Sequence, residues 1–281
     1  MGIRSLINKV TGAGGSRSRD RLLAPPTLAE AVRFPYGPFQ FKTRLARGIS
    51  FAIEASTDLK TWQSIGIGEA QAEDFEYMDS QAPKFSYRFY RMLAEGLRSA
   101  NIIGYASVAL PPGFSMIANP LQGPNNTIGA LFKDWPDGTT LSKFDTRFFR
   151  LSENAMKEKR WSHPLEDLRP TEGAIFYNPT SDYKSHNFVG DVVQGELSVP
   201  IPAGFSVRSS PVPQGGSLED LAFPIANGDV IHLFDRDRQN YVLHPYENDR
   251  WKSGPPIVSV GESFWVAKTQ PGNWSRKLLI A

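Results

Sequence analysis

The chain has 281 residues and a formal net charge of +2, and it is 40% hydrophobic, 12% aromatic and 21% charged. This length and apolar content suit two or three packed cores and exclude a largely disordered chain. The 24 Gly and 22 Pro residues favour turn-rich β-structure over long helices.

Zero cysteines exclude disulfides, thiolate metal sites and Cys nucleophiles. No run reaches the roughly 18 apolar residues of a membrane span, and no signal-like apolar segment follows Met1, so we expect no transmembrane segment. The localisation stays open.

The first 33 residues predict a basic, partly helical arm. Residues 1–50 carry nine Arg and Lys against two acidic residues, so a basic segment precedes a mildly acidic body. Four apolar residues near the start are spaced as one face of a short helix, and a Gly-rich stretch over 12–16 predicts a tether. Thr27 and Glu30 have capping-box spacing, which predicts a short helix over 28–33. We expect the arm to bind a partner through Ile3, Arg4, Leu6, Ile7, Val10, Arg17, Arg19 and Arg21. A solvated leader is the simpler alternative, and nucleic-acid binding is a less favoured one.

The next region predicts antiparallel strands. Apolar and polar residues alternate over 39–44, 51–56 and 87–91. The run Ala55-Ser56-Thr57-Asp58-Leu59, then Trp62 and later Arg88-Phe89-Tyr90-Arg91, resembles the middle and late strands of fibronectin type III domains. It is most similar to a module common in β-rich surface proteins of planctomycetes and verrucomicrobia. The resemblance covers about 60 residues, has little sequence for the earliest strands, and implies a scaffold or adhesion role rather than a reaction.

An internal repeat occupies the rest of the chain. Pro111-Pro112-Gly113-Phe114-Ser115 recurs as Pro202-Ala203-Gly204-Phe205-Ser206, and later landmarks keep their order. The matched landmarks are Leu141 with Ile231, Phe144-Asp145 with Phe234-Asp235, Trp161 with Trp251, Gly173 with Gly261, and Phe176 with Phe264. Each copy predicts a hairpin, with strands over 139–144 and 148–151 in the first copy and over 230–234 and 241–244 in the second. Similar Gly-Phe-Ser units follow the Ser-Thr-Asp-Leu module in the same bacterial proteins, and that likeness implies no activity.

Catalytic and metal-binding patterns are weak. Gly-x-Ser-x-Gly, His-Glu-x-x-His, a strand-borne Gly-x-Gly-x-x-Gly and the P-loop are all absent. The second predicted hairpin would bring His232 and His244 face to face, with Asp229 or Glu247 as a third metal ligand, but the first copy has Ser142 in place of His232. We favour a polar strand face, with no metal, no cofactor and no catalytic residue.

Tryptophans offer an alternative binding role. Five of them lie among Pro, Asp and Asn residues: Trp135, Trp161, Trp251, Trp265 and Trp274. We expect them to plug the ends of β-cores, with Trp161 and Trp251 covering the cores of the two copies. In the alternative, a carbohydrate or peptide stacks on Trp135 and Trp274.

The sequence therefore predicts an all-β chain of antiparallel β-sandwich domains in tandem. The predicted parts are an arm (1–33), a fibronectin type III-like sandwich (34–103), a first β-unit (104–194) and a second β-unit (195–281). The expected function is that of a non-enzymatic structural protein, a subunit or attachment component of a bacterial or phage-like assembly. Its partners would be other copies of itself or other subunits. The alternative is an adhesin module that binds a glycan or a peptide.

Overall fold

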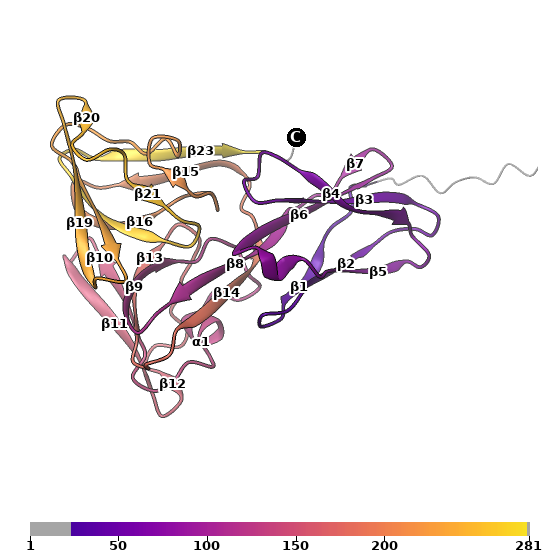
Figure 1. The fold of residues 1–281 in the computed structure, drawn as a ribbon, viewed down its shortest axis with the longest axis horizontal. Coiled ribbons are helices and arrows are strands. Elements are labelled where there is room, and N and C mark those ends of the chain that lie inside the picture. The colour runs from indigo at the N-terminus through magenta and orange to yellow at the C-terminus, as the bar shows by residue number, and fades with distance from the viewer. Residues whose placement is uncertain (1–23, 280–281) are drawn as a thin grey trace, which may run out of the picture.

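Residues 24–279 are described by a computed structural model, and their regular secondary structure is almost entirely antiparallel strands (Figure 1). The helical elements within these residues are η1 (Ala82–Lys84) and α1 (Ile128–Leu131). None of the described helical segments has the length and apolar character that a membrane crossing requires. The predicted all-β class is confirmed, and the alternating sequence runs explain why, because each places one face of a strand in a core.

The first region is a sandwich of two sheets. One sheet has the order β1-β2-β5 and the other β14-β8-β6-β3-β4, with β7 paired to β6. The side chains of Phe39, Phe41, Ile53 and Tyr90 are completely buried between the sheets. The strands are β1 (Ala29–Arg33), β2 (Phe39–Arg44), β3 (Ser50–Ser56), β4 (Gln63–Glu69), β5 (Asp74–Asp79), β6 (Tyr87–Ala94), β7 (Leu97–Arg98), β8 (Ile103–Leu110) and β14 (Lys184–Asp191).

The helix predicted over 28–33 is wrong, because this segment forms strand β1. β1 pairs antiparallel with β2, and Leu28 just before it is buried in the sandwich core. Asn101 fixes Leu28 from both sides: the Leu28 N–H donates to Asn101 Oδ1 (2.9 Å), and Asn101 Nδ2 donates to the Leu28 carbonyl (2.9 Å). The capping-box spacing was overridden by long-range strand pairing, since Thr27 instead accepts a hydrogen bond from Thr43 through its carbonyl.

The two copies form five-stranded sheets with corresponding strand orders. The first sheet has the order β12-β11-β10-β13-β9, and the second has β20-β19-β18-β22-β16. The strands of the first are β9 (Gly113–Ala118), β10 (Thr140–Asp145), β11 (Arg150–Lys157), β12 (Arg160–Trp161) and β13 (Gly173–Asn178). Those of the second are β16 (Gly204–Ser209), β18 (Val230–Asp235), β19 (Asn240–Glu247), β20 (Arg250–Trp251) and β22 (Ser263–Lys268), with a small β17 (Gly216–Ser217) and β21 (Ile257–Val258) pair beside them. Trp161 and Trp251 are buried in the respective cores, as predicted.

A pair of outer strands also flanks each copy. In the sequence, β8 precedes and β14 follows the strands of the first five-stranded sheet, and these two strands pair with each other. In the same way, β15 (Gly195–Ile201) precedes and β23 (Gly272–Leu278) follows the strands of the second sheet, and they also pair with each other. The first pair continues into the sandwich because β8 also pairs with β6. The sheet of the sandwich therefore extends through strands that bracket the first copy (Figure 1).

The two copies pack against each other reciprocally. β13 contacts β16, and the corresponding β22 contacts β9. A Cβ at Gly173 would lie 2.5 Å from Val207 Cγ1, so only glycine permits this approach. Strand pairing also corrects the sequence alignment by two residues: Phe176 pairs with Leu141 and Ser115, whereas Val266, rather than Phe264, pairs with their counterparts Ile231 and Ser206.

Candidate aromatic binding site

The predicted partner-binding residues of the arm lie outside the described residues. They are Ile3, Arg4, Leu6, Ile7, Val10, Arg17, Arg19 and Arg21. The arm as predicted extends to residue 33, but its last six residues belong to the first sandwich through Leu28 and β1.

Neither tryptophan chosen for the alternative ligand site offers a free ring. Trp274 is completely buried in the core of the second copy, and its indole Nε1 donates to the Leu221 carbonyl (2.8 Å). This overturns its assignment as a ligand-binding residue, because no ligand reaches the ring. Trp135 is partly buried against the core of the first copy, packs edge-on against Phe176 (ring centroids 4.7 Å apart), and has the Lys184 ammonium 5.5 Å from its ring centroid.

The two histidines considered for a metal site lie on opposite faces of their hairpin. His232 is opposite Leu243, and His244 is opposite Ile231. Directly opposed residues of antiparallel strands share a face, so neighbouring pairs point to different sides. The side chains of His232 and His244 therefore do not meet, and no group of three potential metal ligands occurs within residues 24–279.

An aromatic pocket opens between the two copies. Its cavity of about 300 Å³ is lined by Phe144 and Phe149 from the first copy and by Phe205, His232, Tyr241 and Trp265 from the second. Phe144 is the penultimate residue of strand β10 and Phe149 lies in the β10–β11 turn, whereas the other four residues lie on β16, β18, β19 and β22. Phe149 is 64% exposed and Phe205 is 41% exposed, so these large apolar rings face solvent. Exposed apolar side chains grouped in this way mark interaction surfaces.

The rings of this pocket are nearly perpendicular to their neighbours. The Phe144 ring lies 5.3 Å from that of Phe149 at 78° and 4.8 Å from that of Trp265 at 69°. The centroid of the Phe205 ring lies 6.3 Å from that of Phe149, with 70° between the ring planes, and 6.4 Å from that of Trp265, with 77° between the planes. Edge-to-face contacts of this kind are favourable and fix the orientation of each ring. The four rings therefore form a preformed aromatic box.

The few polar groups of the pocket are occupied or uncharged. The Trp265 Nε1–H donates to the Tyr241 hydroxyl (3.1 Å), and burial raises the pKa of that phenol. Burial also lowers the pKa of His232, so its imidazole is neutral near pH 7. The lining thus offers ring faces for contact, and it carries neither a carboxylate nor an ammonium or guanidinium group.

The reciprocal position on the other side of the repeat interface is bridged by hydrogen bonds. Gln239, the counterpart of Phe149, binds the backbone of Phe114, the counterpart of Phe205. Arg236 also crosses this side of the interface: its guanidinium donates hydrogen bonds to the carbonyls of Ala109 (3.1 Å) and Met116 (3.3 Å). Three further ring-bearing lining residues have counterparts without rings: His232 corresponds to Ser142, Tyr241 to Leu151 and Trp265 to Ile175. The two copies have diverged so that one of two equivalent positions is an open aromatic pocket.

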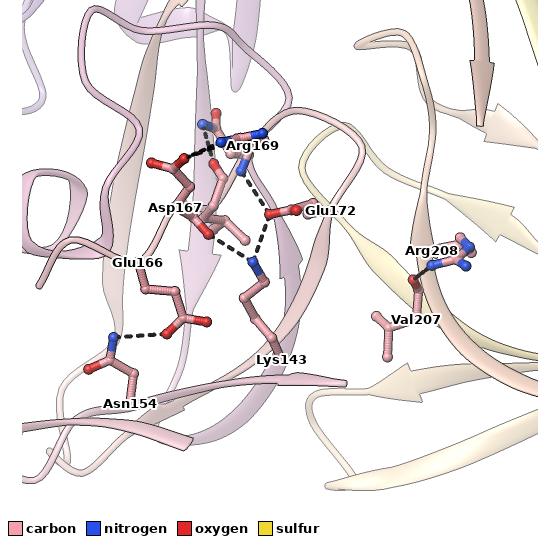
Figure 2. A network of polar contacts seen from close by, with 10 residues as sticks. Lys143, Asn154, Glu166, Asp167, Arg169, Glu172, Val207 and Arg208 are labelled. Atoms are coloured by element: carbon pink, nitrogen blue, oxygen red, sulfur yellow. Dashed lines mark hydrogen bonds and ion pairs between the residues drawn. The ribbon is translucent and has the colours of Figure 1, made fainter. Parts of the chain in front are cut away.

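A polar network in the first copy is a structural clamp (Figure 2). Lys143 donates to Glu172 (2.8 Å) and to the Asp167 carbonyl (2.8 Å), and Arg169 pairs with Asp167 (2.8 Å). Asn154 also donates to Glu166 (3.2 Å) in this network. These contacts fasten the loop before β13 to strands β10 and β11. Each carboxylate shown has a donor, so the network holds the loop and leaves no free acid–base pair.

Sequence reasoning singled out Trp265 and His232 but did not assemble them with the phenylalanines. The useful signal was the comparison of the copies, because His232 replaces Ser142 and Tyr241 replaces Leu151 at matched positions. Phe149 gave no such signal: it was predicted to lie in the returning strand over 148–151, whereas the structure places it in the turn before β11. Among known proteins, no family model matches this chain, and no curated protein sequence matches it closely enough to count as a relative.

Proposed function

We propose that this chain is a non-enzymatic structural protein, an attachment component of a larger assembly, which joins its partner through the aromatic pocket and its N-terminal arm. The observation that carries the proposal is the open aromatic pocket built jointly by both copies, opposite a reciprocal position that hydrogen bonds bridge instead. A surface that is apolar, exposed and preformed suits lasting contact with a partner. We interpret residues 34–103 as a fibronectin type III-like spacer within this structure.

Rigid connections between the three regions support an architectural role. Strand pairing of β8 with both β6 and β14 joins the sandwich to the first copy. The second copy is tied to the sandwich as well, because Gln214 Nε2 donates to the Asp58 carbonyl (2.6 Å) and Leu278 packs on the cluster that contains Phe89. A pocket carried on such a body keeps a fixed distance and orientation relative to the first sandwich.

The lining of the pocket supports binding over catalysis. It contains one neutral imidazole and one phenol that is already hydrogen-bonded, and it has no nucleophile paired with a base. A glycan, the alternative ligand, needs hydrogen-bond partners for its hydroxyl groups, and these rings supply almost none. A partner that presents an apolar group is therefore favoured over a sugar.

Light scattering and negative-stain microscopy of the intact chain over a range of concentrations test the proposal. We expect regular oligomers or particles, and we expect a shift to monomers for Phe149→Ser and for a chain that begins at residue 24. Phe148→Ser is the matched control, because Phe148 is similarly exposed (59%) but does not line the pocket. An intact chain that stays monomeric at every concentration, or a control that dissociates as readily as Phe149→Ser, would contradict the assembly role of this pocket.

A further inference from the structure

Cationic side chains cover many aromatic rings of this molecule, but they do not cover the rings of the pocket. The described residues contain seven cation–π contacts, including Arg91 over Trp62 (4.3 Å) and Lys184 over Trp135 (5.5 Å). The exposed Phe148 has both Arg147 and Arg150 within 5.4 Å of its ring centroid. Within residues 24–279, no such contact involves a ring that lines the pocket. No cation from the described part of the chain therefore lies over these rings.

The arrangement of the rings suits a rounded cation. Phe144, Phe149, Phe205 and Trp265 follow one another at angles of 69–78°, so they form the sides of a box rather than a flat stack. Tyr241 and the neutral His232 complete the lining. Aromatic boxes attract cations through the quadrupole of each ring, most strongly where water is displaced. A flat sugar ring would instead favour one broad aromatic platform.

The chemistry of the lining selects the type of cation. A primary ammonium or a guanidinium would lose hydrogen bonds to water on entry, and the pocket has almost no acceptors to replace them. A quaternary ammonium has no N–H to lose, and its methyl groups gain apolar contact with the rings. We infer that the aromatic pocket binds a quaternary ammonium group, of the kind found on choline or on trimethylated lysine. The inference rests on the proposed attachment role of the same pocket, and it names the group that a partner presents there.

Titration calorimetry with the full chain tests this inference directly. The probes are tetramethylammonium, choline, Nε-trimethyllysine and 3,3-dimethylbutan-1-ol, the uncharged carbon counterpart of choline. We expect saturable binding of tetramethylammonium, and a choline affinity at least roughly tenfold above that of the neutral alcohol. The comparison between choline and trimethyllysine distinguishes a headgroup from a peptide as the source of the ligand.

Variants of the lining residues test whether the binding of tetramethylammonium takes place in the aromatic pocket. Trp265→Leu removes one wall and is expected to weaken binding of tetramethylammonium at least tenfold, whereas Trp265→Phe keeps a ring and retains most of the affinity. Phe149→Gln introduces the residue that occupies the equivalent position in the second copy, where Gln239 binds the Phe114 backbone, and it is expected to abolish binding. Phe114→Leu changes the counterpart of Phe205 on the reciprocal side, outside the pocket, and is expected to leave binding unchanged. Thermal unfolding of each variant identifies any that fail to fold.

Three outcomes would overturn the inference. Equal binding of choline and 3,3-dimethylbutan-1-ol would make the pocket an apolar contact only, and binding of tetramethylammonium that survives both Trp265→Leu and Phe149→Gln would place the site elsewhere. Absence of binding to all four probes overturns it as well. The ligand assay uses dilute protein and needs no assembly, so its failure is separate from that of the proposed function. Assembly without ammonium binding leaves the attachment role intact, and ammonium binding by a permanent monomer overturns that role alone.

Discussion

Gln239 holds the backbone of Phe114 through two hydrogen bonds that cross the interface between the copies. The Phe114 N–H donates to Gln239 Oε1 (2.7 Å), and Gln239 Nε2 donates to the Phe114 carbonyl (3.0 Å). At the equivalent position, Phe149 contacts Phe205 through its ring. Both Gln239 and Phe149 adopt a positive φ of 50°, so the two turns have the same backbone and differ in side-chain chemistry. One side of a nearly symmetric interface is thus fastened, while the other is open to a ligand.

Replacing Gln239 is expected to weaken the fastened side. Gln239→Ala removes both hydrogen bonds to Phe114, and each backbone group is exposed enough for water to replace part of the loss. We expect a decrease of about 1 kcal/mol in the free energy of unfolding. Urea denaturation measures it, with Phe149→Ala as the comparison, since Phe149 makes ring contacts only. A larger loss for Phe149→Ala would show that the aromatic side carries more of the interface energy.

Trp274 and Trp265 should differ sharply on truncation. Trp274→Ala leaves a large cavity in the core of the second copy and leaves the Leu221 carbonyl without its donor. We expect this variant to lose about 3–5 kcal/mol of stability. Trp265→Ala empties part of an already open pocket and should cost much less. Equilibrium unfolding of both variants checks the contrast, and equal losses would mean that Trp265 is a core residue in practice.

The buried pair of Asp229 and Lys268 should contribute strongly to stability. Both side chains are almost completely buried, and Asp229 also accepts hydrogen bonds from the Thr269 N–H (2.7 Å) and the Thr269 hydroxyl (2.9 Å). Burial opposes ionisation of Asp229, but the hydrogen bonds from Lys268 and Thr269 outweigh it and lower the pKa of this carboxyl. Asp229→Asn leaves the Lys268 charge without a partner, and we expect a loss of about 3–5 kcal/mol.

The same pair gives a pH dependence of defined sign. Because the pKa of Asp229 is lower in the folded than in the unfolded chain, its contribution is complete above the unfolded value near 3.8 and is lost as the pH falls below it. Denaturation curves between pH 5 and 2 should show this loss in the wild type. In Asp229→Asn/Lys268→Met, both charges are absent, and the acid-induced loss should be smaller. An unchanged acid profile in the double variant would contradict this assignment.

His186 should make the protein less stable in a separate, milder acidic range. Its ring lies between those of Phe132 and Phe188, whose centroids are 4.4 and 4.6 Å from its own, and its Nε2 atom is buried. This burial lowers the pKa of His186 to about 3. The unfolded chain takes up a proton at this residue below about pH 6.5, whereas the folded chain does not, so stability falls as the pH decreases from 6.5 towards 3. His186→Leu should flatten the profile in this range. His232→Leu is the comparison, since burial lowers the pKa of His232 by less than that of His186; the flattening there should be smaller.

Much of the strand structure was determined by local sequence. Phe39 and Phe41 alternate with polar residues and form the buried face of β2, and Phe51, Ile53 and Ala55 do the same in β3. The first strand of each hairpin was predicted within one residue, because the alternation is encoded over a short stretch, but the returning strands were predicted too short: β11 extends to Lys157 and β19 to Glu247. The repeat could be recognised for the same reason, since the shared Gly-Phe-Ser motifs and the matched tryptophans are local features of the sequence.

Tertiary structure alone decided the features on which function depends. Residues 28–33 have helix-capping signals but form β1 because β2 and Asn101 supply partners from distant parts of the chain. Phe149 and Phe205 are 56 positions apart in the sequence, one in a predicted strand and the other in the repeated Gly-Phe-Ser motif, and their rings meet only because the two sheets pack reciprocally. Periodicity reports which face of an element is apolar, but it carries no information about which other face will lie opposite. A pocket made from two such faces therefore exists only once the copies are packed together.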